Sequence, residues 1–100
     1  MREIAIRIIS RGAFGEIERC IDRAINDTAL TITLRTSLRK FPGCVHWHLK
    51  HGREAGTLEV TFWPRERRAW FTIQSGRKAT WIQEQLTMLN DAIQRRIGDT

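Results

Sequence analysis

The sequence predicts an α+β fold, a two-layer α/β sandwich in which two helices cover one face of a mostly antiparallel five-stranded sheet. Three observations predict this arrangement. Apolar and polar residues alternate in five short segments, as in strands that bury one side only. Two longer segments carry apolar residues at helical spacing. The turns between the later strands are short, and short turns join antiparallel neighbours.

The predicted elements follow one another in the order β-α-β-β-β-β-α, and they form a single domain, 1–100. We expect strands at Arg2–Ile9, Ala29–Thr36, Cys44–Lys50, Thr57–Trp63 and Arg68–Gln74, and helices at Phe14–Asp27 and Arg77–Ile97. Glycine and proline mark the breaks in "SRGAFG", "SLRKFPG", "HGREAG" and "PRER". Ser75 is a candidate N-cap for the last helix.

The apolar residues of each strand are expected to face the helices. They are Ile4, Ile6, Ile8, Leu30, Ile32, Leu34, Val45, Trp47, Leu49, Leu58, Val60, Phe62, Ala69, Phe71 and Ile73. One shared face constrains the register, because a slip of one residue turns every side chain over. A pairing of Leu49 with Leu58 satisfies this condition, and it places His48 opposite Glu59 and His46 opposite Thr61.

The hairpin "TFWPRERRAWFT" allows two registers. Pairing Phe62 with Ala69 sets Thr61 opposite Trp70, whereas a turn one step wider sets Trp63 opposite Trp70. Both registers place the two tryptophans on the face away from the helices. The other residues predicted for this second face are Arg7, Ile9, Thr31, Thr33, Arg35, Cys44, His46, His48, Lys50, Glu59, Thr61, Thr72 and Gln74. A mixture of tryptophans, cations and threonines suggests an interaction surface.

The order of elements resembles one repeat of the TATA-box-binding-protein fold, over nearly the whole chain. This resemblance implies a fold and no function, because one fold serves many functions.

The net charge of +6 is concentrated in the middle of the chain. Residues 35 to 78 contain ten Lys or Arg and three Asp or Glu, a net charge of +7. A basic region favours nucleic acid, anionic lipid headgroups or an acidic protein as partner. A soluble domain from an arginine-rich proteome is the alternative interpretation, since the chain has fourteen Arg and three Lys.

Nucleic acid is the first predicted partner. Trp63 and Trp70 are candidates to stack on bases, and Arg65, Arg67 and Arg68 at the adjacent turn to hold phosphates, with Arg35 on the same face. The alternative is a homodimer or protein-interaction module that buries Trp63 and Trp70 at its centre. In a third interpretation the tryptophans simply cap the sheet, with an arginine stacked on them. A small-molecule ligand is not expected, because two layers leave limited room for a pocket.

Arg77 and Lys78 lie at the start of the last predicted helix, where cations oppose the helix dipole. A bound anion would reverse that effect, so the segment is a candidate phosphate site. Its "GRKA" resembles the double-stranded-RNA-binding domain, which uses basic residues at the start of its last helix. A solvated junction between loop and helix is the alternative.

The run "CVHWHLKH" is the one metal-like pattern in the sequence. Alternate strand residues lie about 6.6 Å apart, so His46 and His48 can lean onto one ion. Glu59, opposite His48, is the candidate third ligand. The simpler interpretation is a pair of strand histidines with a cross-strand contact from His48 to Glu59, and on it neither a metal nor another cofactor is predicted.

No enzyme is expected, because the sequence offers no nucleophile elbow, no assignable carboxylate pair and no phosphate-binding glycine loop. No apolar run is long enough to span a bilayer, and "MREIAIRIIS" is typical of a strand and not of a signal peptide. A cytoplasmic location without a membrane partner is therefore expected. Cys20 and Cys44 are predicted to be free thiols.

Overall fold

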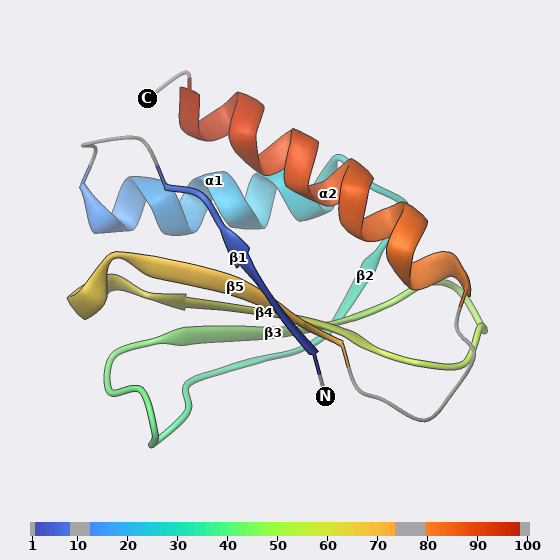
Figure 1. Ribbon diagram of the computed structural model, residues 1–100, viewed down its shortest axis with the longest axis horizontal. Coiled ribbons are helices and arrows are strands. Elements are labelled where there is room, and N and C mark those ends of the chain that lie inside the picture. The colour runs from blue at the N-terminus through green and yellow to red at the C-terminus, as the bar shows by residue number, and fades with distance from the viewer. Residues whose placement is uncertain (1, 9–12, 74–79, 99–100) are drawn as a thin grey trace.

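The computed structural model describes residues 2–8, 13–73 and 80–98. In this part of the chain it confirms the predicted α+β fold and the order of its elements. The strands are β1 (Arg2–Ile6), β2 (Thr31–Thr36), β3 (Val45–Lys50), β4 (Leu58–Trp63) and β5 (Arg68–Ile73), and the helices are α1 (Phe14–Asn26) and α2 (Thr80–Gly98). A 3-10 turn, η1 (Pro64–Glu66), joins β4 to β5. Both helices lie on the same side of the sheet (Figure 1).

The described strands form one antiparallel sheet in the order β1-β5-β4-β3-β2, so β1 and β2 are its edges. The predicted register of β3 and β4 is confirmed, because Leu49 pairs with Leu58. The narrower of the two hairpin registers is also confirmed, because Phe62 pairs with Ala69. The wider register is wrong, since Trp63 stands opposite Arg68.

The core lies between the sheet and the two helices. Large side chains of the sheet, among them Trp47, Phe62 and Phe71, are fully buried there. They meet the apolar stripes of α1 and α2, which include Ile21 and Ile93. The removal of these apolar side chains from water is the main contribution that stabilises a domain of this size. Neither described helix combines the length and apolarity that crossing a membrane requires.

Strand β2 departs from the predicted alternation at a β-bulge. Ile32 pairs with Leu49, but Leu34 pairs with His48, so Thr33 is an extra residue on this strand. A bulge of this kind reverses the facing of every later residue, because the side-chain period is two. Leu34 therefore lies on the second face, 45% exposed, and the prediction that it faces the core is wrong.

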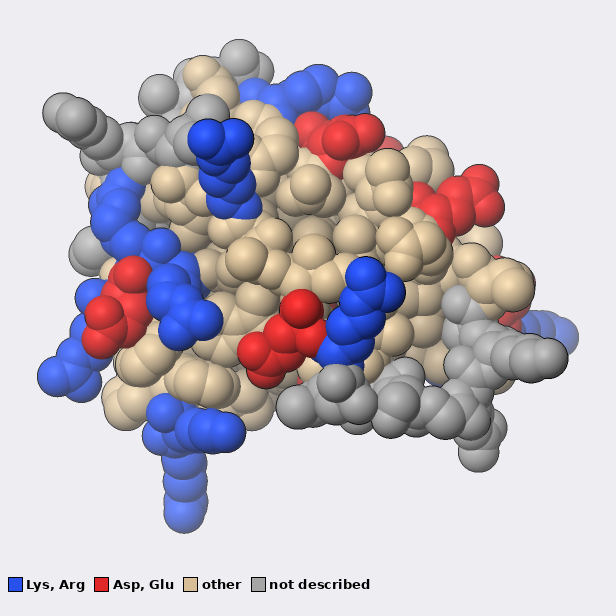
Figure 2. All heavy atoms as spheres, viewed as in Figure 1, with Lys and Arg blue, Asp and Glu red and all other residues tan. Residues whose placement is uncertain are grey.

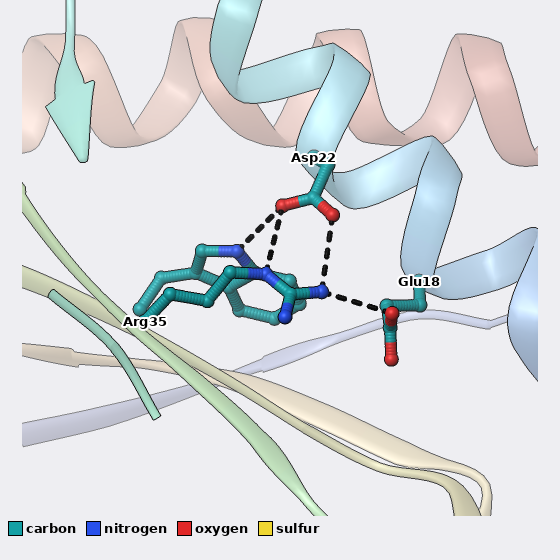
Figure 3. Close-up of polar contacts among 4 residues, drawn as sticks. Glu18, Asp22 and Arg35 are labelled. Carbon is teal, nitrogen blue, oxygen red and sulfur yellow. Dashed lines mark hydrogen bonds and ion pairs between the residues drawn. The ribbon is translucent and has the colours of Figure 1, made fainter. Parts of the chain in front are cut away.

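Arg35 is the second correction caused by the bulge, because it stands opposite Trp47 and faces the helices instead of the second face. Its guanidinium reaches α1, donating to Glu18 Oε2 at 2.9 Å and to Asp22 Oδ2 at 3.2 Å (Figure 3). It also lies 5.5 Å from the centre of the Trp47 ring. The hydrogen bond to Asp22 is the main cause that raises the pKa of Arg35.

A second ion pair joins the C-terminal ends of the two helices. Arg96 donates to both carboxylate oxygens of Asp27, at 2.7 and 2.9 Å, and this contact lowers the pKa of Asp27. A carboxyl whose pKa is lowered by folding stabilises the fold above its ordinary pKa, and that contribution is lost as the pH falls through the lowered value.

We therefore expect Asp27→Asn to lower the melting temperature at neutral pH. The difference from wild type should shrink below pH 3.8, the ordinary pKa; a constant difference down to about pH 2 would contradict this explanation.

Candidate functional site

The second face of the sheet is partly covered by the loop of residues 37–44, which connects β2 to β3 on the side away from the helices (Figure 1). The Phe41 ring lies 5.0 Å from the Trp63 ring and 4.9 Å from the Trp70 ring, in a tilted and an edge-on contact. Trp70 is consequently only 5% exposed, while Trp63 is half-buried. The sequence predicts that a base or a second chain stacks on Trp70, but in this structure the Trp70 ring is almost completely covered.

Hydrogen bonds fix this loop in place. The Leu38 amide donates to Cys44 Sγ at 3.2 Å, and the Cys44 amide donates to the Phe41 carbonyl at 3.0 Å. The Trp63 indole N–H donates to the Pro42 carbonyl at 3.1 Å. Gly43 has a φ of +83°, a left-handed conformation that favours glycine.

Cys20 and Cys44 are free thiols, as predicted.

Cations gather at the end of the sheet where this loop meets the η1 turn. Arg65, Arg67 and Arg68 are exposed there, and Arg67 has a φ of 49° that reverses the chain into β5. The Arg68 guanidinium lies 5.2 Å from the Trp70 ring, and Lys40 Nζ lies 5.7 Å from the Phe41 ring. Figure 2 shows Lys and Arg side chains concentrated toward this end, at the left of the view. We call the group of Lys40, Arg65, Arg67 and Arg68 the basic end.

A hollow of about 290 Å³ opens between β1 and the start of β5. Arg67 and Arg68 line it together with Trp70 and Glu3. Two arginines and one glutamate among its lining residues give the hollow a net positive charge. Such a site suits an anion, because guanidinium groups hold phosphate or carboxylate oxygens in a planar geometry.

A second group of polar side chains lies in the middle of the second face, on β3 and β4. His46 and His48 point from β3 toward Glu59, which stands opposite His48 on β4. His46 Nε2 is 3.0 Å from Glu59 Oε1, His48 Nε2 is 3.4 Å from the same oxygen, and the two Nε2 atoms are 3.0 Å apart. We call these three residues the histidine triangle.

The histidine triangle is well shielded from water on the side of His46. His46 is 5% exposed and Glu59 is 9% exposed, whereas His48 is half-buried. Burial lowers the pKa of His46, and the neighbouring Glu59 carboxylate only partly opposes that effect. A neutral imidazole keeps a lone pair that can accept a hydrogen bond or bind an ion. The other ring nitrogen, Nδ1, lies 2.8 Å from Thr61 Oγ1.

The structure separates the residues predicted as one site into different places. The basic end contains Arg65, Arg67 and Arg68, and Trp63 lies beside it. Arg35 instead forms ion pairs with Glu18 and Asp22 on α1. The predicted positions Ile9, Gln74, Ser75, Arg77 and Lys78 lie outside the described residues, so the candidate phosphate site at the last helix stays a prediction.

Sequence reasoning missed Phe41 and Lys40, which contribute to the covered face and to the basic end. A phenylalanine next to a lysine in a proline- and glycine-containing loop was the signal that could have found them.

Comparison with known proteins adds no family assignment: no protein-family model matches this chain, and no curated protein or solved structure shows significant similarity to it.

Proposed function

We propose that this protein is a non-enzymatic domain that binds nucleic acid through the phosphate backbone. The observation that carries the proposal is the hollow beside Trp70, which Arg67 and Arg68 of the basic end both line. The net charge of +6 supports the same partner class, since it attracts a polyanion at long range.

The burial of Trp70 decides what kind of contact this domain offers. Its ring already meets the Phe41 edge and the Arg68 guanidinium, so it cannot also receive a base. The affinity then depends on cations and phosphates, with little discrimination among sequences, because phosphate contacts position a nucleic acid without reading its bases.

Titration of a fluorescent oligonucleotide at several salt concentrations tests this proposal. Binding through phosphates predicts that log K falls linearly with log salt concentration, by about 0.7–0.9 for each phosphate contact. Replacing both Arg67 and Arg68 by alanine is expected to weaken binding at least about tenfold and to reduce the slope by about 1.4–1.8. Anisotropy measurements on single-stranded and duplex oligonucleotides give both quantities.

A matched control removes two cations elsewhere. Arg53, in the loop between β3 and β4, and Arg95, on α2, are both exposed. The Arg53→Ala/Arg95→Ala variant has the same net charge as the Arg67→Ala/Arg68→Ala variant, and we expect it to lose much less affinity. Equal losses in the two variants would refute a localised site, and absence of binding by wild type at low salt would refute the function.

A further inference from the structure

We propose that His46, His48 and Glu59 bind one divalent transition-metal ion, with Zn²⁺ as the best-suited ion, on the second face of the sheet. This site is independent of the basic end and of the nucleic-acid proposal. Its ligands would be the two Nε2 atoms and one carboxylate oxygen, Oε1.

The separations within the histidine triangle are those of atoms bound to a common ion. Zn²⁺ binds imidazole nitrogen and carboxylate oxygen at about 2.0–2.2 Å, so ligands at tetrahedral to right angles stand about 2.9–3.5 Å apart. The three observed separations are 3.0, 3.0 and 3.4 Å. His46, His48 and Glu59 are also the group of three potential ligands that the described residues bring together within 4.8 Å.

Hydrogen bonding alone satisfies this triangle less well. Two imidazole Nε2 atoms only 3.0 Å apart cannot both point hydrogens at each other. If both Nε2 atoms carry hydrogens that point at Oε1, a carboxylate oxygen can accept both hydrogen bonds, but the two N–H groups then lie only 3.0 Å apart; otherwise one nitrogen presents its lone pair to the carboxylate. A cation at the centre accepts a lone pair from each of the three atoms and removes the conflict.

The backbone places the ligands without help from a flexible segment. His46 and His48 are two residues apart on β3, and Glu59 is directly paired with His48 on the neighbouring strand. These strands lie inside the sheet, between β2 and β5, so the ligand positions are fixed by backbone pairing on both sides. A rigid arrangement lowers the cost of ordering the ligands when an ion binds.

Thr61 supplies the outer contact that such a site needs. When His46 binds an ion through Nε2, its proton resides on Nδ1, which then donates to Thr61 Oγ1 at 2.8 Å. An outer hydrogen bond of this kind fixes the tautomer and the ring orientation of a metal-bound histidine. The His48 side chain is 35% exposed, so water could reach the triangle from this side and supply a fourth ligand.

Calorimetric titration of the chelator-treated full chain with ZnCl₂ tests the proposal. We expect one ion per chain and a melting temperature that rises by about 10–20 °C when free Zn²⁺ is about 100 times the Kd. His48→Gln and Glu59→Gln are each expected to weaken binding at least about tenfold, and Thr61→Val by a smaller factor. On addition of Zn²⁺, the ring NMR signals of His46 and His48 should shift while those of His51 stay in place.

The control is His51→Gln, which removes a histidine that pairs with Glu54 and stacks on Trp81 outside the triangle. It is expected to bind Zn²⁺ as wild type does. His48→Gln is the deciding variant, because a half-buried position tolerates glutamine and circular dichroism can confirm its fold. The proposal is overturned if wild type takes up no Zn²⁺, or if folded His48→Gln binds it as tightly as wild type.

Discussion

Replacement of Asp22 by alanine is expected to lower the free energy of unfolding by about 2–3 kcal/mol. Asp22 Oδ1 accepts the indole N–H of Trp47 at 2.7 Å, and Trp47 is fully buried. A buried donor left without its acceptor costs about 1–3 kcal/mol. The Arg35 guanidinium also loses a partner, but this exposed ion pair contributes about 1 kcal/mol or less. Urea unfolding at neutral pH measures the total.

Two further variants separate these contributions. Asp22→Asn keeps an oxygen for the indole and removes the charge that Arg35 needs, so we expect a loss of about 1 kcal/mol or less. Arg35→Met removes the ion pair from the other side and keeps an unbranched side chain near Trp47, with a similarly small loss expected. If Asp22→Ala proved no more destabilising than Asp22→Asn, the buried indole hydrogen bond could not be the main contribution of Asp22.

The central part of this fold was predictable because its strands alternate without interruption. In β3, β4 and β5 the apolar residues that face the core alternate with residues that face the other way. Turning one of these strands over would place its charged or histidine side chains in the core. A pairing of Leu49 with Leu58 satisfies this alternation, and the structure has that pairing, which brings His48 opposite Glu59. The hairpin between β4 and β5 follows the same logic, which sets Thr61 opposite Trp70.

The bulge in β2 could not be predicted in this way. The segment "TITLRT" alternates as well as its neighbours do, and no glycine marks Thr33 as the extra residue. The bulge is instead accompanied by tertiary contacts, because it turns Arg35 toward Glu18 and Asp22 on α1. Such contacts join segments that are distant in sequence, and a local pattern contains no information about them.

The histidine triangle was only half predictable for a related reason. Strand register gave the backbone neighbours of His46, His48 and Glu59, but the convergence of three side chains on one point depends on their rotamers. Rotamers are set by packing between side chains, which strand register alone does not give. The covering of Trp70 by the loop with Phe41 was likewise not expected from the sequence. The position of this loop depends on contacts between residues that are distant in sequence, such as the hydrogen bond from the Trp63 indole N–H to the Pro42 carbonyl.

Replacement of Phe41 by alanine is expected to lower the free energy of unfolding by about 2–3 kcal/mol. A fully buried phenylalanine would lose about 3–5 kcal/mol, and the smaller loss is expected because Phe41 is half-buried. The variant removes ring contacts to both Trp63 and Trp70 and uncovers the latter. Urea unfolding gives the energy, and quenching of tryptophan fluorescence by acrylamide should become stronger as Trp70 is exposed.

Phe41→Leu is the matched control, because leucine keeps apolar bulk over the sheet and lacks the ring. Aromatic pairs add about 0.5–1.5 kcal/mol beyond the burial of their area, so we expect Phe41→Leu to cost about 1 kcal/mol and to keep Trp70 shielded. An equal loss in both variants would mean that ring geometry, and not apolar burial, holds the loop on the sheet. Unchanged stability and quenching in Phe41→Ala would instead show that the loop does not shield Trp70 in solution.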